Sequence, residues 1–463
     1  MSALPNVLGR PLARRLLLAA ASAIAIVAVV AVRTGAGSDV PPADDGTATA
    51  SPDRIILSPA ADTATSQTVT WRTDEATQEG EVQVAPADDP DQVRTVEADA
   101  SVAERLPNSR LSARHHSATL TDLEPSTAYT YRVGHDDDFS PWTTFTTAPA
   151  ADSTDPWTFL YFGDAQWGLD AGWSSTVDQA FAQYPDARIA LTAGDQVNDG
   201  NDDHQWEQWF EAVAPWASTR SFLTVAGNHE HYGDEQTVRY RSHVQYPRNG
   251  PEGQDDLTYR VDVGDVRFIT LDGSITGGPS DPTDNGLGAL QAAWLEQQLA
   301  DNPRTWTVVT IHQPMFSAAK LRDNLAQRTA FLPLLEQYGV DLVLQGHDHA
   351  YARGHLAEND VAGGYSGPTY VVANAGDKYY DLDPAGRNNW TINDAVRDAA
   401  ADKISTYQAV RVEGDRLVYS SYVATIDDSG VGTGPLPQGL APGELLDTVT
   451  VTKAVDGRPF VPR

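Results

Sequence analysis

The sequence contains no cysteine and little positive charge, and each shortage excludes a class of function. Without cysteine, the 463-residue chain can form neither a disulfide nor a thiolate metal site. It has 32 lysines and arginines against 64 aspartates and glutamates, which gives a net charge of −32. Proteins bind nucleic acids largely through lysine and arginine side chains that displace counterions from the phosphates. With so few of these residues, we do not expect a nucleic acid as a partner. Any metal ion must therefore be held by histidine, aspartate, asparagine or similar ligands.

Arginines and a long apolar run stand together near the N-terminus. Arg10, Arg14 and Arg15 precede an uncharged stretch at 16–32. A basic lead before an apolar run is typical of a secretory signal peptide, and the run is also nearly long enough for an uncleaved membrane anchor. We expect a signal peptide or anchor over 1–36 and a linker rich in Pro, Gly, Ser, Ala and Asp over 37–52. The protein is then secreted or anchored at the cell surface, outside the cytoplasm.

Short segments rich in β-branched and aromatic residues follow, separated by turn residues. They are RIILSP, QTVTWRT, GEVQVAP, HSATLTDL, AYTYRVG and PWTTFTT. This spacing predicts a β-sandwich over 53–149, and the stretch LTDLEPSTAYTYRVG resembles fibronectin type III-like domains. His115 and His116 lie in one of these strands and match no metal-ligand spacing, so we expect them to pack at the surface or an edge.

From about residue 155 the pattern changes to apolar runs that alternate with helical stretches. The runs are WTFLYF, ARIALTA, SFLTVA, VRFITL, TWTVVTI and VDLVLQ. Strands that are apolar throughout are buried on both faces, and their alternation with helices predicts a layered α/β domain over 155–453.

Polar residues follow five of these runs where the strands are expected to end. They are Asp164, Asp195, Asn228 with His229, His312, and His347 with His349. The carboxyl ends of strands in such a sheet border one crevice, so these side chains are expected to meet. Four of the five motifs carry glycine just before the polar residue, which permits a sharp exit from the strand. Asp, Asn and His suit two hard cations, and two cations about 3.5–4 Å apart can hold a bridging hydroxide for attack on phosphorus.

The order GDAQ, GDQVN, GNHE, His312 and GHDH resembles the calcineurin-like metallophosphoesterases. With the β domain before it, the chain is most similar to the purple acid phosphatases and their bacterial relatives. The resemblance implies a two-sheet α/β sandwich, four layers in the order α-β-β-α, and metal-dependent hydrolysis of small phosphate esters by a dinuclear centre with a bridging hydroxide. It also implies the following ligands: Asp164 and His349 for the first metal, Asp195 as the bridge, and Asn228, His312 and His347 for the second metal.

Two positions depart from that family pattern. Purple acid phosphatases carry a tyrosine ligand to ferric iron where this chain has Asn198, and other members place a histidine where it has Gln166. An amide oxygen is a suitable ligand for a hard metal, so Gln166 is expected to complete the first site. The two metal ions are then Fe, Mn or Zn, and ferric iron is not assured. His229 is expected to contact the phosphate or protonate the leaving oxygen, and Arg322 to bind substrate.

Several alternatives remain open at this level. The site suits an acid phosphatase-like phosphomonoesterase, and equally a phosphodiesterase or nucleotidase. Because the tyrosine or histidine ligand is missing, a catalytically degenerate binding module at the cell surface is the alternative from another class. The sequence does not indicate an oligomeric state.

Overall fold

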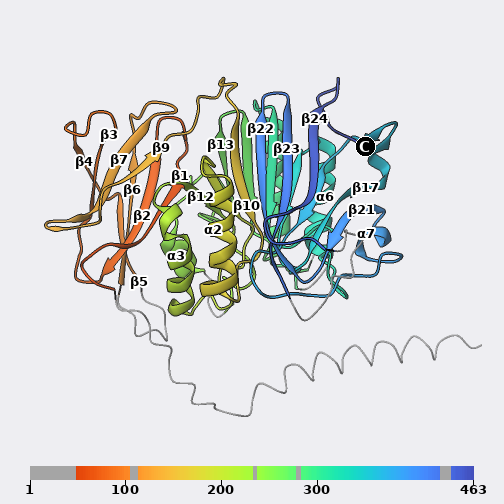
Figure 1. Cartoon of the computed structure of the whole chain (residues 1–463), viewed down its shortest axis with the longest axis horizontal. Helices are drawn as coiled ribbons and strands as arrows, with labels where there is room; N and C mark the ends of the chain where they lie inside the picture. The colour runs from red at the N-terminus through yellow and green to blue at the C-terminus, as the bar shows by residue number, and fades with distance from the viewer. Residues whose placement is uncertain (1–47, 105–112, 233–236, 278–282, 428–438) are drawn as a thin grey trace, which may run out of the picture. The chain divides into compact units, whose positions relative to one another are not determined.

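The computed structural model describes residues 48–104, 113–232, 237–277, 283–427 and 439–463 (Figure 1). The signal peptide or anchor expected over 1–36 lies outside the described residues. Among the residues that are described, no helix is both long and apolar enough to cross a membrane. Asp45–Arg463 form one structural unit, within which the arrangement below applies.

A β-sandwich forms the N-terminal part of this unit, as the turn-separated β segments predict. One sheet contains β1 (Asp53–Pro59), β2 (Gln67–Asp74), β6 (Ala113–Leu120) and β5 (Ala100–Glu104). The other contains β4 (Arg94–Glu97), β3 (Glu81–Pro86), β7 (Ala128–His135), β8 (Asp138–Phe139) and β9 (Thr143–Thr146). Trp71, Val82 and Tyr131 belong to its buried apolar core, which both sheets line through alternate side chains.

The second domain begins with three parallel strands, β10 (Trp157–Phe162), β11 (Ile189–Thr192) and β12 (Ser221–Thr224). The C-terminal strands extend this sheet: β22 (Ile404–Glu413) pairs with β10, and β23 (Arg416–Ile426), β24 (Leu445–Lys453) and β25 (Pro459–Pro462) follow in order (Figure 1). The short strands β19 (Gly364–Tyr365) and β18 (Asp360–Val361) complete that edge. On the other side Leu57 of β1 pairs with Ser221 of β12, so the sandwich continues the sheet to thirteen strands.

A second sheet of seven strands packs in the same domain. Its order is β13 (Tyr259–Val263), β14 (Val266–Leu271), β15 (Trp306–Ile311), β16 (Leu342–Gln345), β20 (Thr369–Val372), β17 (Tyr351–Leu356) and β21 (Ala395–Ala401). The helical segments are η1 (Leu169–Trp173), α2 (Ser174–Gln183), α3 (Asp203–Ala217), α4 (Val238–His243), α5 (Leu287–Ala300), α6 (Leu325–Tyr338), η2 (Ala357–Asn359) and α7 (Asn389–Ile392).

Alternate residues of this second sheet enter two different cores. Val308 lies in the cluster that includes Phe159 of the first sheet, whereas its neighbour Val309 lies in the cluster that includes Leu295 of α5 and Phe331 of α6. Successive side chains of a strand point to opposite faces, so one face packs on the first sheet and the other on helices. Residues of α2 and α3 pack into the first cluster. The predicted four-layer α/β sandwich after a β-sandwich is therefore confirmed.

A buried ionic cluster joins β1 and β2 to α3 and α4. The Arg54 guanidinium donates to both carboxylate oxygens of Asp203, at 2.8 and 2.9 Å, and Arg72 lies 3.2 Å from the same carboxylate. His115 and His116 lie near this junction and are 5% and 1% exposed, so the expectation of surface or edge packing is wrong. His116 stacks on Trp71 and His115 meets His243 edge to face at 4.9 Å, because β6 is covered here by α4.

Candidate metal centre

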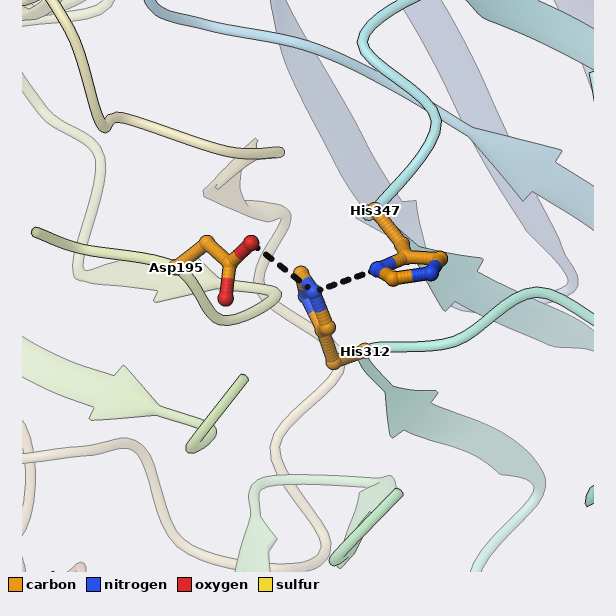
Figure 2. Close-up of side chains that lie close together, drawn as sticks. All are labelled: Asp195, His312 and His347. Atoms are coloured by element: carbon orange, nitrogen blue, oxygen red, sulfur yellow. Dashed lines mark hydrogen bonds and ion pairs between the residues drawn. The ribbon is translucent and has the colours of Figure 1, made fainter. Parts of the chain in front are cut away.

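The polar residues after the five strands meet at one edge of the two sheets. His312, directly after β15, lies between Asp195 and His347 (Figure 2). Its Nε2 atom is 3.2 Å from Asp195 Oδ2 and 3.1 Å from His347 Nδ1. Asn228 Oδ1 lies 3.2 Å from the same nitrogen. Side chains from positions 195, 228, 312 and 347 thus present oxygen and nitrogen atoms to one point.

A second group shares Asp195 with the first. Nitrogen or oxygen atoms of Asp164, Asp195 and His349 all lie within 4.8 Å of one another, as do those of Asp195, His312 and His347. His349 Nε2 is 3.6 Å from Asp164 Oδ1. The geometry therefore contains two overlapping sets of possible ligands with one carboxylate in common.

Glycine and unusual backbone angles permit this crowding. A Cβ atom on Gly227 would lie 2.1 Å from Asp195 Oδ1, and one on Gly194, whose φ is +90°, would lie 2.6 Å from His312 Nδ1. Asp195, His347 and His349 themselves have φ of 52°, 75° and 47°. Left-handed conformations in residues other than glycine cost energy and concentrate at functional sites.

Backbone carbonyls orient two of the imidazoles. His312 Nδ1 donates to the Ala193 carbonyl at 2.7 Å, and His349 Nδ1 donates to the Lys378 carbonyl at 3.2 Å. With Nδ1 bound to a carbonyl, Nε2 is the atom that each ring, once neutral, can offer to a metal ion. In both rings this nitrogen is the one that faces the carboxylates.

Asp164 carries an atom that no protein group satisfies. Its Oδ2 accepts the His347 amide at 2.6 Å, but its fully buried Oδ1 has no hydrogen-bond partner. A buried charged oxygen without a partner is costly unless a cation supplies the missing interaction. This orphaned atom, between His349 and His312, shows that the donor set fits a metal ion.

The pKa values of the buried carboxylates and imidazoles are shifted by burial and by one another's charges. Burial, together with repulsion from Asp195, raises the pKa of Asp164 to about 8. Burial alone would lower the pKa of His312, but the carboxylates of Asp195 and Asp164 raise it to about 9. Burial and nearby Lys378 lower the pKa of His349 to about 3, so that ring is neutral, the form that binds metals.

Gln166 is next to Asp195, although its amide oxygen points elsewhere. Its Nε2 donates to Asp195 Oδ2 at 2.5 Å, and its Oε1 accepts from Lys378 Nζ at 3.1 Å. A metal ligand role for Gln166 would have to replace the contact with Lys378. Sequence reasoning did not find Lys378, which follows β20 in the stretch YVVANAGDKYYD and reaches the site with both its carbonyl and its ammonium group.

His229 stands beside the two groups, with its side chain 22% exposed. Its amide donates to Asp195 Oδ1 at 3.0 Å, and its Nδ1 donates to the Asn198 carbonyl at 2.5 Å. The other ring nitrogen, Nε2, lies 3.9 Å from Asp195 Oδ2. The imidazole is therefore held with one nitrogen toward the shared carboxylate.

Arg322 lies at the rim of the site, where its guanidinium donates to the His347 carbonyl at 2.7 Å and lies 4.8 Å over the Tyr380 ring.

Glu230, in the GNHE motif, was not predicted to have a role. Its carboxylate accepts the amides of Asp195, Gln196 and Gly227 at 2.6–2.9 Å. It thereby holds together the loops that follow β11 and β12.

Two family models match the chain. Residues 52–147 match the purple acid phosphatase N-terminal domain, and residues 158–351 match the calcineurin-like phosphoesterases. Among solved structures, the yellow lupin purple acid phosphatase PPD1 aligns with 88% of this chain and 75% of its own, with a TM-score of 0.70 and 19% identity. The structure of PhoD aligns with 88% of this chain and 91% of its own, with a TM-score of 0.60 and 13% identity. At these identities the structural likeness shows the fold.

Curated relatives match a shorter part. Purple acid phosphatase 18 of Arabidopsis thaliana is 29% identical over 274 residues, which are 57% of this chain and 58% of that protein. An uncharacterised protein of Mycobacterium tuberculosis is 33% identical over 276 residues, which are 53% of this chain and 52% of that protein. The chain spans about half the length of the curated relatives it matches.

Proposed function

Because the chain belongs to the purple acid phosphatase-like branch of the calcineurin-like phosphoesterases, a family of phosphoric ester hydrolases, we propose that it hydrolyses phosphate monoesters with the help of two metal ions. The observation that carries this proposal is the orphaned Oδ1 of Asp164 beside two overlapping sets of Asp, Asn and His atoms. Turnover separates this proposal from a catalytically degenerate binder, which would hydrolyse none of the esters even with metal bound.

The residues divide between two ion positions in this proposal. Asp164 and His349 hold one ion, Asn228, His312 and His347 hold the other, and Asp195 is shared. When bound, such a pair of cations activates water and neutralises charge on the phosphoryl oxygens. Fe, Mn and Zn all suit this mixture of oxygen and nitrogen ligands. Gln166 joins the first set if its contact with Lys378 is exchanged.

His229 acts on the substrate. When its ring is protonated, Nδ1 remains bound to the Asn198 carbonyl and Nε2 carries a proton toward the site. That nitrogen can bind a phosphoryl oxygen or give its proton to the departing alcohol. Arg322 adds positive charge at the rim of the site, where the negatively charged substrate enters.

Activity of the purified protein on 4-nitrophenyl phosphate, bis(4-nitrophenyl) phosphate and a 5′-nucleotide tests the proposal. We expect the monoesters to be hydrolysed faster than the diester, and Asp195→Asn or His347→Ala to lower kcat/KM by roughly 10³-fold or more. Asp415→Asn, in the exposed turn after β22, is the matched control and should keep full activity.

A smaller loss of about 10²-fold is expected for His229→Ala, and the loss should be larger for esters with poor leaving groups. If Asp195→Asn kept substantial turnover, the assignment of the site would be wrong. A faster reaction with the diester would favour the phosphodiesterase alternative. The location outside the cytoplasm remains a proposal that N-terminal sequencing of the exported protein tests.

A further inference from the structure

Two exposed aromatic side chains are connected to His229, one by a ring contact and one through Asn198. The described residues with large exposed apolar side chains include three aromatics: Trp142, Trp167 and Tyr232, which are 43%, 55% and 47% exposed. Trp142 lies in the sandwich domain under the guanidinium of Arg132, 4.9 Å from its ring. Trp167 and Tyr232, in contrast, both lie in loops that also carry site residues.

Trp167 is held in a conformation that a bulky residue rarely adopts. Its φ is 68°, and the next residue, Gly168, has φ 67°. Its carbonyl accepts the Asp377 amide at 3.1 Å, which fixes the backbone on one side. A left-handed bulky residue is a strained position that the surroundings must enforce, and such positions are common in ligand clamps.

Asn198 connects Trp167 to His229. Its side-chain oxygen accepts the indole N–H of Trp167 at 2.9 Å, and its carbonyl accepts Nδ1 of His229 at 2.5 Å. Asn198 stands where purple acid phosphatases carry the tyrosine ligand, so here the position anchors an indole. The bond uses the edge of the indole, and Trp167 remains 55% exposed.

Tyr232 extends the same side of the site. Its ring centroid is 6.3 Å from that of His229, and its amide donates to the His229 carbonyl at 3.2 Å. The Tyr232 ring therefore neighbours the imidazole directly, and the Trp167 indole is linked to the imidazole through Asn198. A substrate whose phosphate reaches His229 brings its organic group to these two rings.

We propose that Trp167 and Tyr232 form an aromatic wall that stacks on a planar ring in the leaving group, so that the preferred substrates are aryl or nucleoside phosphates. This inference rests on the proposed function and names the substrate class of the same site. Stacking of a flat ring on aromatic side chains is strong and tolerant of the ring's identity, so the wall selects for a ring as such.

Binding of two non-hydrolysable probes tests the wall without turnover. Phenylphosphonate and methylphosphonate share a head group and differ in the ring, and isothermal titration of the metal-loaded protein gives the dissociation constant of each. We expect the wild-type protein to bind phenylphosphonate about tenfold more tightly. Trp167→Gly should abolish the preference and leave methylphosphonate binding unchanged, and glycine also suits the left-handed backbone.

Matched variants separate the wall from general effects. Trp142→Ala removes an exposed indole in the sandwich domain and should leave the preference intact. Trp167→Phe keeps a ring and should retain most of it. Equal dissociation constants for the two probes in the wild-type protein would overturn the proposal, as would an equal loss for both probes in Trp167→Gly.

Turnover measurements then distinguish aryl from nucleoside substrates, and they separate the aromatic wall from the proposed function. For Trp167→Gly we expect kcat/KM to fall about tenfold for phenyl phosphate and AMP, and less than about twofold for glycerol 3-phosphate. A selective loss with only one of the ring substrates identifies the class that the wall serves. If the wild-type protein preferred phenylphosphonate but hydrolysed none of the esters, the proposed function would fail while the wall stood.

Discussion

Two clusters of buried charge among the described residues differ in how their carboxylates are paired. At the junction of β1 and β2 with α3, Asp203 receives the Arg54 guanidinium on both oxygens and Arg72 on one of them. At the strand ends, Asp164 lies next to Asp195 and keeps an oxygen without a partner. Both oxygens of the Asp203 carboxylate are thus hydrogen-bonded to arginine, whereas at the strand ends two carboxylates lie close together and one of their oxygens accepts no hydrogen bond.

The difference in how the carboxylate oxygens are paired indicates that the junction cluster is structural and that the strand-end cluster binds a ligand. Folding favours buried charges that are paired, and it tolerates unpaired ones where function requires them. The junction cluster should therefore determine stability with little effect on chemistry. The strand-end cluster should determine chemistry and gain stability only from what binds to it.

The largest expected effect on stability comes from breaking the junction cluster. Asp203→Asn leaves Arg54 buried without its anion, whereas Arg72 keeps its ion pair with Asp53, so we expect the free energy of unfolding to fall by about 3–5 kcal/mol. Urea denaturation at pH 7 measures it, with Asp415→Asn as the control. The folded variant should keep its kcat on 4-nitrophenyl phosphate. A loss below about 1 kcal/mol would mean that the cluster is not structural.

The stabilising effect of Asp203 should depend on pH. Burial works against the charged form of Asp203, but the neighbouring arginines hold its pKa below the usual range. A depressed pKa gives stability that is present above the ordinary aspartate value of about 3.9 and is lost as the pH falls below it. The difference in unfolding free energy between wild type and Asp203→Asn should therefore shrink below about pH 4. A constant difference from pH 7 to pH 3 would contradict this.

Metal ions should act on the other cluster alone. At a concentration one hundred times the dissociation constant, Mn²⁺ or Zn²⁺ should stabilise the chelator-treated protein by about 2.7 kcal/mol for each site. Asp203→Asn should gain as much as wild type, whereas His312→Ala should gain less. Thermal denaturation with and without the ion measures both. Equal stabilisation of all three proteins would indicate binding elsewhere.

A smaller effect of opposite sign is expected at Asp164. In the chelator-treated protein, Asp164→Asn removes one of two adjacent buried carboxylates and should raise the free energy of unfolding by about 1 kcal/mol. Its stabilisation by added metal should be lost at the same time. A destabilised metal-free variant would show that Asp164 is balanced by the protein itself.

The convergence of the strand-end residues can be predicted from the sequence because their positions follow from chain order. A buried strand, a glycine and a polar residue recur, and parallel strands end at one edge, so local pattern alone brings Asp164, Asp195 and His312 together. The two-domain fold follows from the same kind of pattern. The shift from short β segments to alternating strands and helices is visible in the sequence.

Contacts between segments far apart in the chain are not predictable in this way. Nothing near Lys378 indicates that it meets Gln166, and nothing near Arg54 indicates Asp203, 149 positions later. The burial of His115 likewise depends on α4, which comes more than a hundred residues after it. These contacts depend on how segments pack within and between the domains, and such packing leaves no local period or spacing in the sequence.

The central claim is that the strand-end cluster is incomplete without cations. Elemental analysis of the reconstituted, gel-filtered protein tests it most directly, together with Asp195→Asn, which removes the shared carboxylate. We predict close to two equivalents of Fe, Mn or Zn in the wild-type protein and a loss of metal in the variant. A wild-type protein that retains no metal after reconstitution would contradict the account.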